Sequence, residues 1–284
     1  MKICYIKEEK NAKWYNKKIK IKEENGVYIC KIPINKNSVG ENCVRPKNKK
    51  IVNKKLIDNK ISTVVLSEYL ESINEIELNR IKILDGRTLF SYLIYDVIEY
   101  IAVKQGKKIE EFEVSILANN SNSIEINSII MIAKQVKNLN IVTNNIQKFK
   151  KVEEYLYSEL GILIKVSNNK NKAILKSNII INTDFEEELT NKYTIPNKGI
   201  IINANKNINI KSKKFNGLNI NGYKIEIPEE YKLEGFRNET IYESYVYNQN
   251  FEKIRGKIIE DNIRIAELIG NNGAIDKNEF LKVK

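Results

Sequence analysis

Short apolar runs alternate with helix-patterned stretches over most of the chain. Runs rich in Ile and Val, each bounded by polar residues, predict strands. They lie at residues 63–66, 81–84, 112–118, 140–143, 178–182 and 199–203. Apolar residues at three- and four-residue spacing predict helices at 87–105, 124–136 and 146–160. This alternation is typical of an α/β protein with a mainly parallel, doubly wound sheet that helices cover on both faces.

The two ends of the chain have other patterns. Near the N-terminus, residues 18–22 and 27–32 flank Asn25-Gly26 and predict a β-hairpin, and residues 35–50 predict a loop. Near the C-terminus a strand at 223–227 stops at Pro228. A capping-box pattern from Thr240 to Glu243 then predicts a final helix that ends at Gly270. Its apolar face would consist of Phe251, Ile254, Ile258, Ile265 and Ile269.

These patterns divide the chain into four segments. Residues 1–50 form a β-rich segment and loop, and residues 51–111 an α/β segment with a long connecting helix. Residues 112–235 form a Rossmann-like domain of the nucleotide-binding type, and residues 236–284 a C-terminal helix and tail. We therefore expect a Rossmann-like core that follows an N-terminal hairpin and α/β segment.

The turn after residues 112–118 lies where a dinucleotide-binding fold has its glycine-rich phosphate loop. That loop uses one Gly for the tight turn, one for the approach of the pyrophosphate and one for helix–strand packing. Residues 118–123 read Ala-Asn-Asn-Ser-Asn-Ser and contain no Gly. Asn tolerates the backbone angles of the turn, but a Cβ at Asn120 would lie where the pyrophosphate comes close. We predict that tight dinucleotide binding is lost, while the helix N-terminus leaves weak anion binding open.

Two further strand ends carry a family pattern. Residues 142–145 read Val-Thr-Asn-Asn, and residues 177–183 read Ser-Asn-Ile-Ile-Ile-Asn-Thr. Together with the loop, residues 112–184 resemble the nicotinamide-nucleotide domain of the shikimate dehydrogenase and glutamyl-tRNA reductase type. That group has V-x-N-R-T and A-D-I-V-I-N-A-T at these positions. The resemblance covers about a quarter of the chain.

The resemblance implies a Rossmann-like fold and makes NADP the candidate cofactor, although no cofactor is certain. In that group the Asn-Arg pair helps to select the 2′-phosphate of NADP. Asn144 matches the Asn, but Asn145 replaces the Arg, which weakens the implied phosphate clamp. The candidate cofactor-binding residues are Ala118, Asn119, Asn120, Ser121, Asn144, Asn145 and Thr183. The catalytic Lys/Asp pair or nucleophilic Cys of that group has no assignable counterpart, so the catalytic residues stay unknown.

Composition limits the available chemistry. The chain contains no His, which removes the commonest general base near neutral pH and the commonest metal ligand. Cys4, Cys30 and Cys43 are widely spaced, a pattern that favours neither a disulfide framework nor a zinc site. No apolar run approaches the roughly 20 residues of a membrane helix, and the first residues lack a signal-peptide pattern. We expect a cytoplasmic protein without a metal or a membrane partner.

The net charge of +12 comes mainly from lysines spread along the chain. Proteins that read bases or grip phosphates favour Arg, and the chain has Arg only at positions 45, 80, 87, 237, 255 and 264. We interpret the lysines as solvated surface, including the densest run from Lys47 to Lys55. Nucleic acid is thus an unfavoured partner, though the charge keeps it open.

Several other groups have a functional and a structural interpretation. Residues 85–87 (Asp-Gly-Arg), 182–184 (Asn-Thr-Asp) and 203–205 (Asn-Ala-Asn) follow predicted strands, where parallel sheets place binding groups. Capping and loop hydrogen bonds are the favoured explanation for all three. Aromatic side chains could stack on bases, but packing in a core or interface is favoured. They are Trp14, Tyr15, Tyr242, Tyr245 and Tyr247.

Three functional hypotheses follow. The favoured one is a divergent Rossmann-like protein, a pseudo-oxidoreductase with degraded dinucleotide binding and a binding or regulatory role. Its partner would be a small molecule, a nucleotide or a protein. The second is an NAD(P)-dependent oxidoreductase with a Gly-free phosphate loop that binds through Asn side chains and the helix N-terminus. The third is a Lys-rich nucleic-acid-binding protein.

Overall fold

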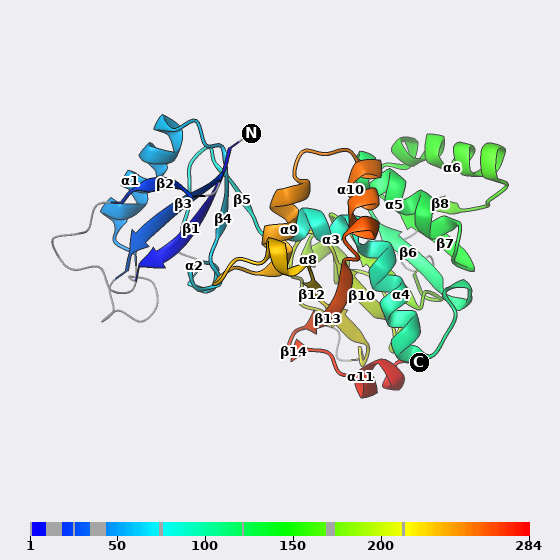
Figure 1. The fold of residues 1–284 in the computed structure, drawn as a ribbon. Helices are drawn as coiled ribbons and strands as arrows, with labels where there is room; N and C mark the ends of the chain where they lie inside the picture. The colour runs from blue at the N-terminus through cyan, green and yellow to red at the C-terminus, as the bar shows by residue number, and fades with distance from the viewer. Residues whose placement is uncertain are drawn as a thin grey trace. The chain divides into compact units, whose positions relative to one another are not determined.

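The computed structural model contains two compact units (Figure 1). Described are residues 2–9, 19–24, 26–34, 44–73, 76–120, 122–168, 174–211 and 214–284, without the side chains of 123–125 and 189. The N-terminal unit comprises Met1–Gly86 and Ile227–Asn248, and the Rossmann unit comprises Arg87–Glu226 and Gln249–Lys284. This division differs from the four segments expected from the sequence, because residues 227–248 pack with the first unit rather than with their chain neighbours.

The N-terminal unit is built on a five-stranded sheet with the order β2-β3-β1-β4-β5. Its strands are β1 (Ile3–Glu9), β2 (Ile21–Glu24), β3 (Val27–Pro33), β4 (Thr63–Leu66) and β5 (Lys82–Leu84). β2 and β3 pair antiparallel and confirm the predicted hairpin pairing, with Gly26 at φ +78° in the turn. Asn25 lies outside the described residues. The other neighbouring strands are parallel.

Helices α1 (Pro46–Asp58), α2 (Glu68–Ser72) and α9 (Asn238–Val246), with the short turn η2 (Glu229–Tyr231), complete this unit. The predicted loop at 35–50 was wrong at its end, because α1 begins at Pro46. Proline suits the first turn of a helix, since its fixed φ is helical and its missing N–H has no partner there. Residues 35–43 of that loop lie outside the described residues.

Two of the three cysteines lie in the core of the N-terminal unit. Cys4 and Cys30 are buried free thiols. Burial raises the pKa of Cys4 far above its ordinary value and that of Cys30 to about 12. Since the thiolate is the nucleophilic form, these two side chains act as small apolar core residues.

The predicted final helix from the Thr240–Glu243 capping box to Gly270 is wrong as a single helix. Instead, α9 begins at Asn238 with Arg237 as its N-cap and ends at Val246, and α10 (Phe251–Glu260) and a strand, β13 (Arg264–Gly270), follow. Asn262 adopts a left-handed backbone, φ 52°, and ends the helical path. β13 pairs antiparallel with β12 (Gly222–Glu226) and with β14 (Gly273–Ala274). The four-residue spacing of the isoleucines favours a helix, but pairing with β12, which is distant in sequence, makes this segment a strand.

The Rossmann unit contains a six-stranded sheet with the order β11-β10-β9-β6-β7-β8. The strands are β6 (Glu113–Leu117), β7 (Asn138–Val142), β8 (Lys165–Ser167), β9 (Ile179–Asn182), β10 (Ile200–Asn203) and β11 (Leu218–Ile220). All neighbouring pairs are parallel. Counted from β6, the order is 3-2-1-4-5-6, that of dinucleotide-binding folds. The predicted parallel α/β fold is confirmed.

Short edge strands complete this sheet and were not predicted. β8 and β11 are each three residues long. Directly before β11, Gly217 lies against Gly199, the residue before β10, and a Cβ there would be 1.9 Å from the carbonyl oxygen of Gly199. Only glycine permits this approach without a shift of the backbone.

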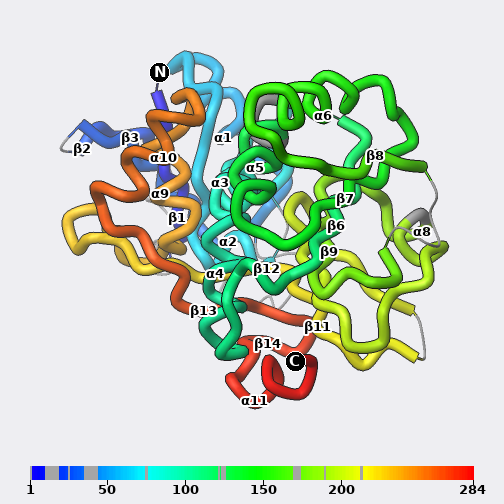
Figure 2. Tube along the Cα trace, turned by 90° about the vertical axis from the view of Figure 1, so that its right-hand side faces the viewer, coloured from blue at the N-terminus to red at the C-terminus, as the bar shows by residue number. Residues whose placement is uncertain are grey.

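Helices cover one face of the Rossmann sheet. α3 (Arg87–Tyr92), α4 (Ile94–Gln105) and α5 (Ser123–Ala133) contact one another there, and α6 (Ile146–Leu160) packs against β8 (Figure 2). On the opposite face Leu117, Ile180 and Ile201 pack with Phe185 and Tyr193. The remaining elements are η1 (Ile109–Glu111), α8 (Glu187–Thr190) and α11 (Lys277–Lys282). None of the described helices has the length and apolarity needed to cross a membrane.

Candidate functional site

The strand order of the Rossmann sheet reverses between β6 and β9, and the candidate site lies at the carboxyl ends of these strands. Ligands of open α/β sheets bind in the crevice at such a point. Three segments meet there: the loop after β6, the end of β7 and the end of β9. We call their interacting residues the loop cluster. Its members are Asn119, Asn120, Asn144, Lys148, Thr183 and Asp184.

The carboxylate of Asp184 is bound by the loop. The N–H of Asn119 donates to Asp184 Oδ1 at 2.8 Å, and the N–H of Asn120 donates to Oδ2 at 2.8 Å. The side-chain Nδ2 of Asn120 also donates to Oδ2, at 2.9 Å. Backbone N–H groups of this turn are the donors that a Rossmann fold offers to a pyrophosphate. In this chain the Asp184 carboxylate accepts the hydrogen bonds of two N–H groups of this turn.

The same loop is fixed on its other side. Asn119 Oδ1 accepts a hydrogen bond from the N–H of Asn144 at the end of β7, at 2.8 Å. Lys148, in the first turn of α6, donates to Asn120 Oδ1 at 3.3 Å. The loop thus connects β6 with the ends of β7 and β9 through side-chain hydrogen bonds.

The structure brings most of the predicted cofactor-binding residues together, but in other roles. Ala118 is buried, and its N–H donates to the carbonyl of Val142. Thr183 donates to the carbonyl of Leu117 through its N–H and its Oγ1, at 3.0 and 3.1 Å. Asn145 is exposed; its N–H donates to Thr143 Oγ1, and its side chain makes no cap to α6. Ser121 lies outside the described residues.

Asp184 makes loop hydrogen bonds, which were the favoured explanation for residues 182–184. The sequence did not give the partner of Asp184, which is the loop after β6. The available signal was a carboxylate at the end of the strand that neighbours β6. Its meaning depends on the pairing of β6 with β9, which the sequence alone does not give.

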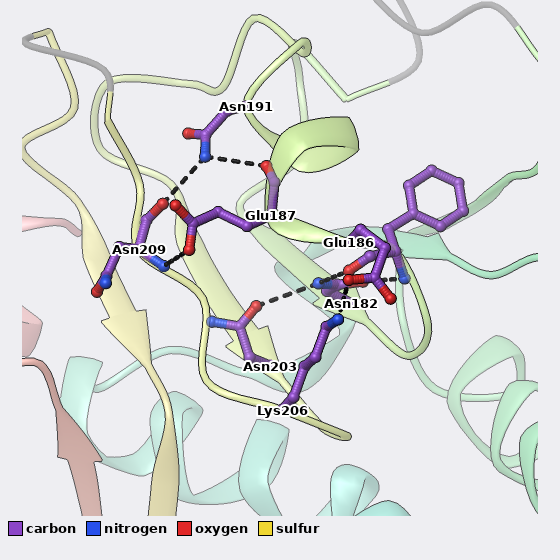
Figure 3. Close-up of polar contacts among 8 residues, drawn as sticks. Asn182, Glu186, Glu187, Asn191, Asn203, Lys206 and Asn209 are labelled. Atoms are coloured by element: carbon purple, nitrogen blue, oxygen red, sulfur yellow. Dashed lines mark hydrogen bonds and ion pairs between the residues drawn. The ribbon is translucent and has the colours of Figure 1, made fainter.

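Beside the loop cluster, four buried asparagines and the exposed Asn271 link the carboxyl ends of β9, β10 and β11 with the segment after β13. We call these side chains the asparagine network: Asn182, Asn203, Asn219, Asn221 and Asn271. Asn182 Nδ2 donates to Asn203 Oδ1 at 3.3 Å (Figure 3). Asn203 Nδ2 lies 2.8 Å from Asn219 Oδ1 and 2.9 Å from Asn221 Oδ1. Asn219 and Asn221 both donate to Asn271 Oδ1, at 3.0 and 2.7 Å.

The network also shapes the turn that carries Asp184. Asn182 Oδ1 accepts from the N–H of Phe185 at 2.9 Å, and Asn182 Nδ2 donates to the Phe185 carbonyl at 3.0 Å. These bonds close the turn from residue 182 to 185 and direct Asp184 toward the loop. Since Asn203 is fully buried and Asn182 nearly so, the turn is held by groups that water does not compete for.

A second, exposed set of contacts holds the segment after β10 (Figure 3). Glu187 of α8 accepts from the N–H of Asn209 and pairs with Lys211 at 2.9 Å. The hydrogen bond from Lys211 lowers the pKa of Glu187. Asn191 donates to the carbonyl of Asn209 at 3.0 Å, and Lys206 pairs with Glu186. These contacts fix the segment after β10, and we assign no chemical role to them.

The predicted strand-end motif at residues 85–87 makes structural contacts. In the N-terminal unit the N–H of Gly86 donates to Glu243 Oε2 at 2.6 Å, and Arg237 donates to the carbonyl of Asp85 at 2.8 Å. Arg87 belongs to the Rossmann unit, where it donates to the carbonyl of Asn203 at 3.1 Å and to the side chain of Asn207. The favoured structural interpretation agrees with these bonds.

Glu71 of α2 gives the N-terminal unit a testable pH dependence. Burial raises the pKa of Glu71 from 4.5 to about 7; Arg237, whose Nε lies 2.6 Å from Oε2, lowers it, and nearby Asp85 and Glu239 raise it. The folded state therefore holds a proton that the unfolded state releases, and the associated stability is lost as the pH rises from 4.5 through 7. We expect Glu71→Gln to remove this loss, about 1–2 kcal/mol after allowance for solvent screening.

The measurement is urea unfolding of both proteins at pH 5 and pH 8. The difference in unfolding free energy between variant and wild type should move in favour of the variant at pH 8. Glu68→Gln, an exposed carboxylate of the same helix, is the control and should show no such change. An equal pH response of the two variants would contradict the prediction.

Other candidate chemistry is limited in the described part of the chain. No group of three or more His, Cys, Asp or Glu side chains could hold a metal among these residues. Next to Thr183 lies a small apolar cavity of about 20 Å³, lined by Ile116, Ile129 and Ile181. Tyr242 is buried and packs near Tyr231, in agreement with the core interpretation. Trp14 and Tyr15 lie outside the described residues.

Comparison with known proteins yields similarity of low degree. No protein-family model and no curated protein sequence matches the chain. Similar solved structures include L-tryptophan dehydrogenase from Nostoc punctiforme, 8% identical with a TM-score of 0.34, over 75% of this chain and 65% of that one. Shikimate 5-dehydrogenase from Listeria monocytogenes is 12% identical with a TM-score of 0.29, over 70% and 77%. Δ1-pyrroline-2-carboxylate reductase from Thermococcus litoralis is 16% identical with a TM-score of 0.26, over 35% of this chain and 31% of the reductase.

At these identities and TM-scores, similarity says nothing about the activity of this chain. The class of protein is defined by its own topology: a Rossmann-type α/β unit with parallel strands in the order 3-2-1-4-5-6, joined to a second α/β unit. The Rossmann-like fold that the sequence resemblance implied is thereby confirmed.

Proposed function

We propose that this chain is a divergent Rossmann-type protein that has lost efficient hydride transfer and keeps the fold for a binding or regulatory role. The observation that carries the proposal is the Asp184 carboxylate bound to the N–H groups of Asn119 and Asn120. A dinucleotide that used this loop in the usual way would place its pyrophosphate where a negative charge already lies.

Binding of a dinucleotide at this loop would cost free energy, because it would break the hydrogen bonds of Asp184. Hydrogen bonds to a charged group contribute about 1.5–3 kcal/mol each, and Asp184 accepts bonds from two backbone groups and one side chain of the loop. A nucleotide would have to replace these bonds and move the carboxylate away from its own phosphates. The side chain of Asn120 and the replacement of the family's Arg by Asn145 add to the loss.

The absence of histidine, together with the lack of an assignable Lys/Asp pair or nucleophilic Cys, supports the same conclusion from the chemical side. Hydride transfer to or from a carbonyl is coupled to proton transfer, and His is the commonest group for that step. The chain has no His, and among the described residues the loop cluster offers amides, one lysine, one bound carboxylate and the Thr183 hydroxyl, which donates to the carbonyl of Leu117. A partner of the Rossmann unit would thus be a protein or a small molecule that does not need the pyrophosphate position.

Thermal unfolding of the whole protein with NADP, NADPH, NAD, NADH and ATP, each at millimolar concentration, tests the proposal. A ligand at 100 times its dissociation constant would add about 2.7 kcal/mol of stability. We expect no saturable shift relative to a neutral solute at the same concentration. A saturable shift with a nicotinamide nucleotide would reject the proposal and favour an oxidoreductase with a Gly-free loop, to be followed by nicotinamide absorbance with candidate substrates.

A further inference from the structure

We propose that Asn272 is a site of spontaneous covalent modification, at which the side-chain amide is lost as ammonia after attack by the backbone nitrogen of Gly273. The products, aspartate and isoaspartate, would disturb the asparagine network through the neighbouring residue, Asn271. This modification is independent of the proposed function, since it lies in the turn between β13 and β14 and requires only water.

The reaction conserves atoms without any other partner. The nitrogen of Gly273 bonds to Cγ of Asn272, the Cγ–Nδ2 bond breaks, and the amide group leaves as ammonia with the proton of the Gly273 N–H. Water then opens the resulting imide ring at the side-chain carbonyl, which gives aspartate, or at the main-chain carbonyl, which gives isoaspartate. Glycine favours this attack, because it has no Cβ beside the attacking nitrogen and its backbone is free to rotate.

The sequence offers several Asn-Gly pairs, so the structure must distinguish between them. Three pairs lie completely within the described residues of the Rossmann unit: Asn216-Gly217, Asn221-Gly222 and Asn272-Gly273. The fourth, Asn25-Gly26, lies partly outside the described residues. Because the reacting residues are the same in every pair, we expect the tertiary structure to decide which of them reacts.

Asn272 has the freedom that the reaction needs. It forms, with Asn271, the turn of a hairpin in which Gly270 pairs with Gly273. Asn272 and Gly273 are both exposed, and apart from its chain neighbours nothing lies within 4 Å of the position that a Cβ of Gly273 would take. The Asn272 side chain makes no hydrogen bond to a described residue. Its Cγ can therefore rotate toward the nitrogen of Gly273.

Asn221 is restrained by its side chain. The residue is buried, its Oδ1 accepts from Asn203 Nδ2 at 2.9 Å and from the N–H of Ile208 at 3.1 Å, and its Nδ2 donates to Asn271 Oδ1 at 2.7 Å. Rotation of its Cγ toward Gly222 would break these bonds where little water is available to replace them. We therefore expect this pair to react slowly.

Asn216 is exposed but restrained by its backbone. Its N–H donates to the carbonyl oxygen of Asn197 at 2.9 Å and to Asn197 Oδ1 at 3.1 Å. Gly217 lies so close to Gly199 that even a Cβ would be 1.9 Å from the Gly199 carbonyl oxygen. Formation of the imide requires the peptide between Asn216 and Gly217 to rotate, and this contact opposes the rotation. Exposure alone therefore does not select the reactive pair.

Modification of Asn272 would reach the asparagine network through the adjacent residue. Asn271 Oδ1 accepts hydrogen bonds from the Nδ2 groups of Asn219, at 3.0 Å, and Asn221, at 2.7 Å. Isoaspartate inserts a methylene group into the main chain of the turn that places Asn271. We therefore expect the isoaspartate form to weaken both the β13–β14 pairing and the two hydrogen bonds that Asn271 accepts.

The test is incubation of the full-length wild-type protein at pH 8 in water enriched in oxygen-18, followed by proteolysis at acidic pH and mass spectrometry. The heavy oxygen marks carboxyl groups that formed during the incubation. We expect products at Asn272 to form about tenfold faster than at Asn216 or Asn221, which corresponds to a difference of about 1.4 kcal/mol in activation free energy. Equal rates at the three pairs, or a faster reaction at Asn216 or Asn221, would overturn the inference.

Two controls separate the tertiary structure from the local sequence. In denaturing guanidinium chloride the three pairs should react at similar rates, and a tenfold preference for Asn272 that persists there would show that the fold does not select it. Asn272→Gln keeps an amide but requires a larger ring for the same attack, so it should give no product at this position within the same incubation.

The effect on the asparagine network has its own measurement. The isoaspartate form, separated from the unmodified protein by ion exchange, should show shifted side-chain amide NMR signals for Asn219 and Asn221, whose Nδ2 groups donate to Asn271. Asn272→Gln, which leaves the length of the main chain unchanged, should keep these signals near their wild-type positions. Unchanged signals in the isoaspartate form would overturn the proposed effect on the network.

Discussion

Replacing Asn203 by alanine is expected to lower the free energy of unfolding of the Rossmann unit by about 3–5 kcal/mol. Asn203 is fully buried at the end of β10, and its Nδ2 lies within hydrogen-bond distance of Asn219, Asn221 and the carbonyl of Ile220. Its Oδ1 accepts from Asn182. Alanine would leave the buried polar groups that Asn203 contacts without a hydrogen-bond partner, and it would create a cavity. Both effects lower the stability.

Urea unfolding would measure this loss of stability, and hydrogen exchange of the β10 amides (Ile200–Asn203) would show that the loss lies in the Rossmann unit. Asn205→Ala removes an exposed amide two residues further along the chain and should stay within about 0.5 kcal/mol of the wild type. Comparable small effects of both substitutions would show that the asparagine network contributes little to stability.

The second large effect is expected for Arg255→Met, at about 2–3 kcal/mol of lost stability. Arg255 of α10 forms a two-pronged pair with Asp96 of α4, in which NH2 lies 3.2 Å from Oδ1, and it also donates to the carbonyl of Tyr92. The side chains of Arg255 and Asp96 are 13% and 22% exposed, so methionine would leave a mostly buried carboxylate without this partner. Thermal or urea unfolding at pH 7 measures the effect.

A double-mutant cycle separates the pair from the packing of the arginine stem. Adding Asp96→Asn to Arg255→Met removes the stranded charge and should recover part of the lost stability. Lys253→Met, an exposed cation of the same helix, should have little effect. If the double variant is as unstable as the sum of the single ones, the pair does not act as a unit.

The local elements of the fold could be predicted because their signals lie within a few residues. Helix α6 spans 146–160 as expected, since Phe149, Val152 and Leu156 form one buried stripe and Gly161 ends the helix at φ 66°. The Ile- and Val-rich runs became β4, β6, β7, β9 and β10 because fully buried parallel strands need continuous apolar sequence. The fold class followed from their alternation.

The candidate site could be predicted only in part. The sequence identified the loop and the loss of its glycines, because both are local features. It did not reveal that Asp184, 65 residues after Asn119, accepts hydrogen bonds from this loop. That contact depends on the pairing of β6 with β9, and β9 is not the next strand after β6 along the chain.

By itself the sequence determined the types of the apolar strands and of helices such as α6, the absence of glycine in the loop after β6 and the absence of histidine chemistry. Only the tertiary structure decided the strand order, the strand at Arg264–Gly270, the packing of residues 227–248 with the N-terminal unit and the place of Asp184. Periodicity and turn residues report on neighbours within one or two turns of chain. Strand pairing and hydrogen bonds such as those of Asp184 join residues that are far apart in the sequence. They contribute to stability only once the folded chain has brought those residues together.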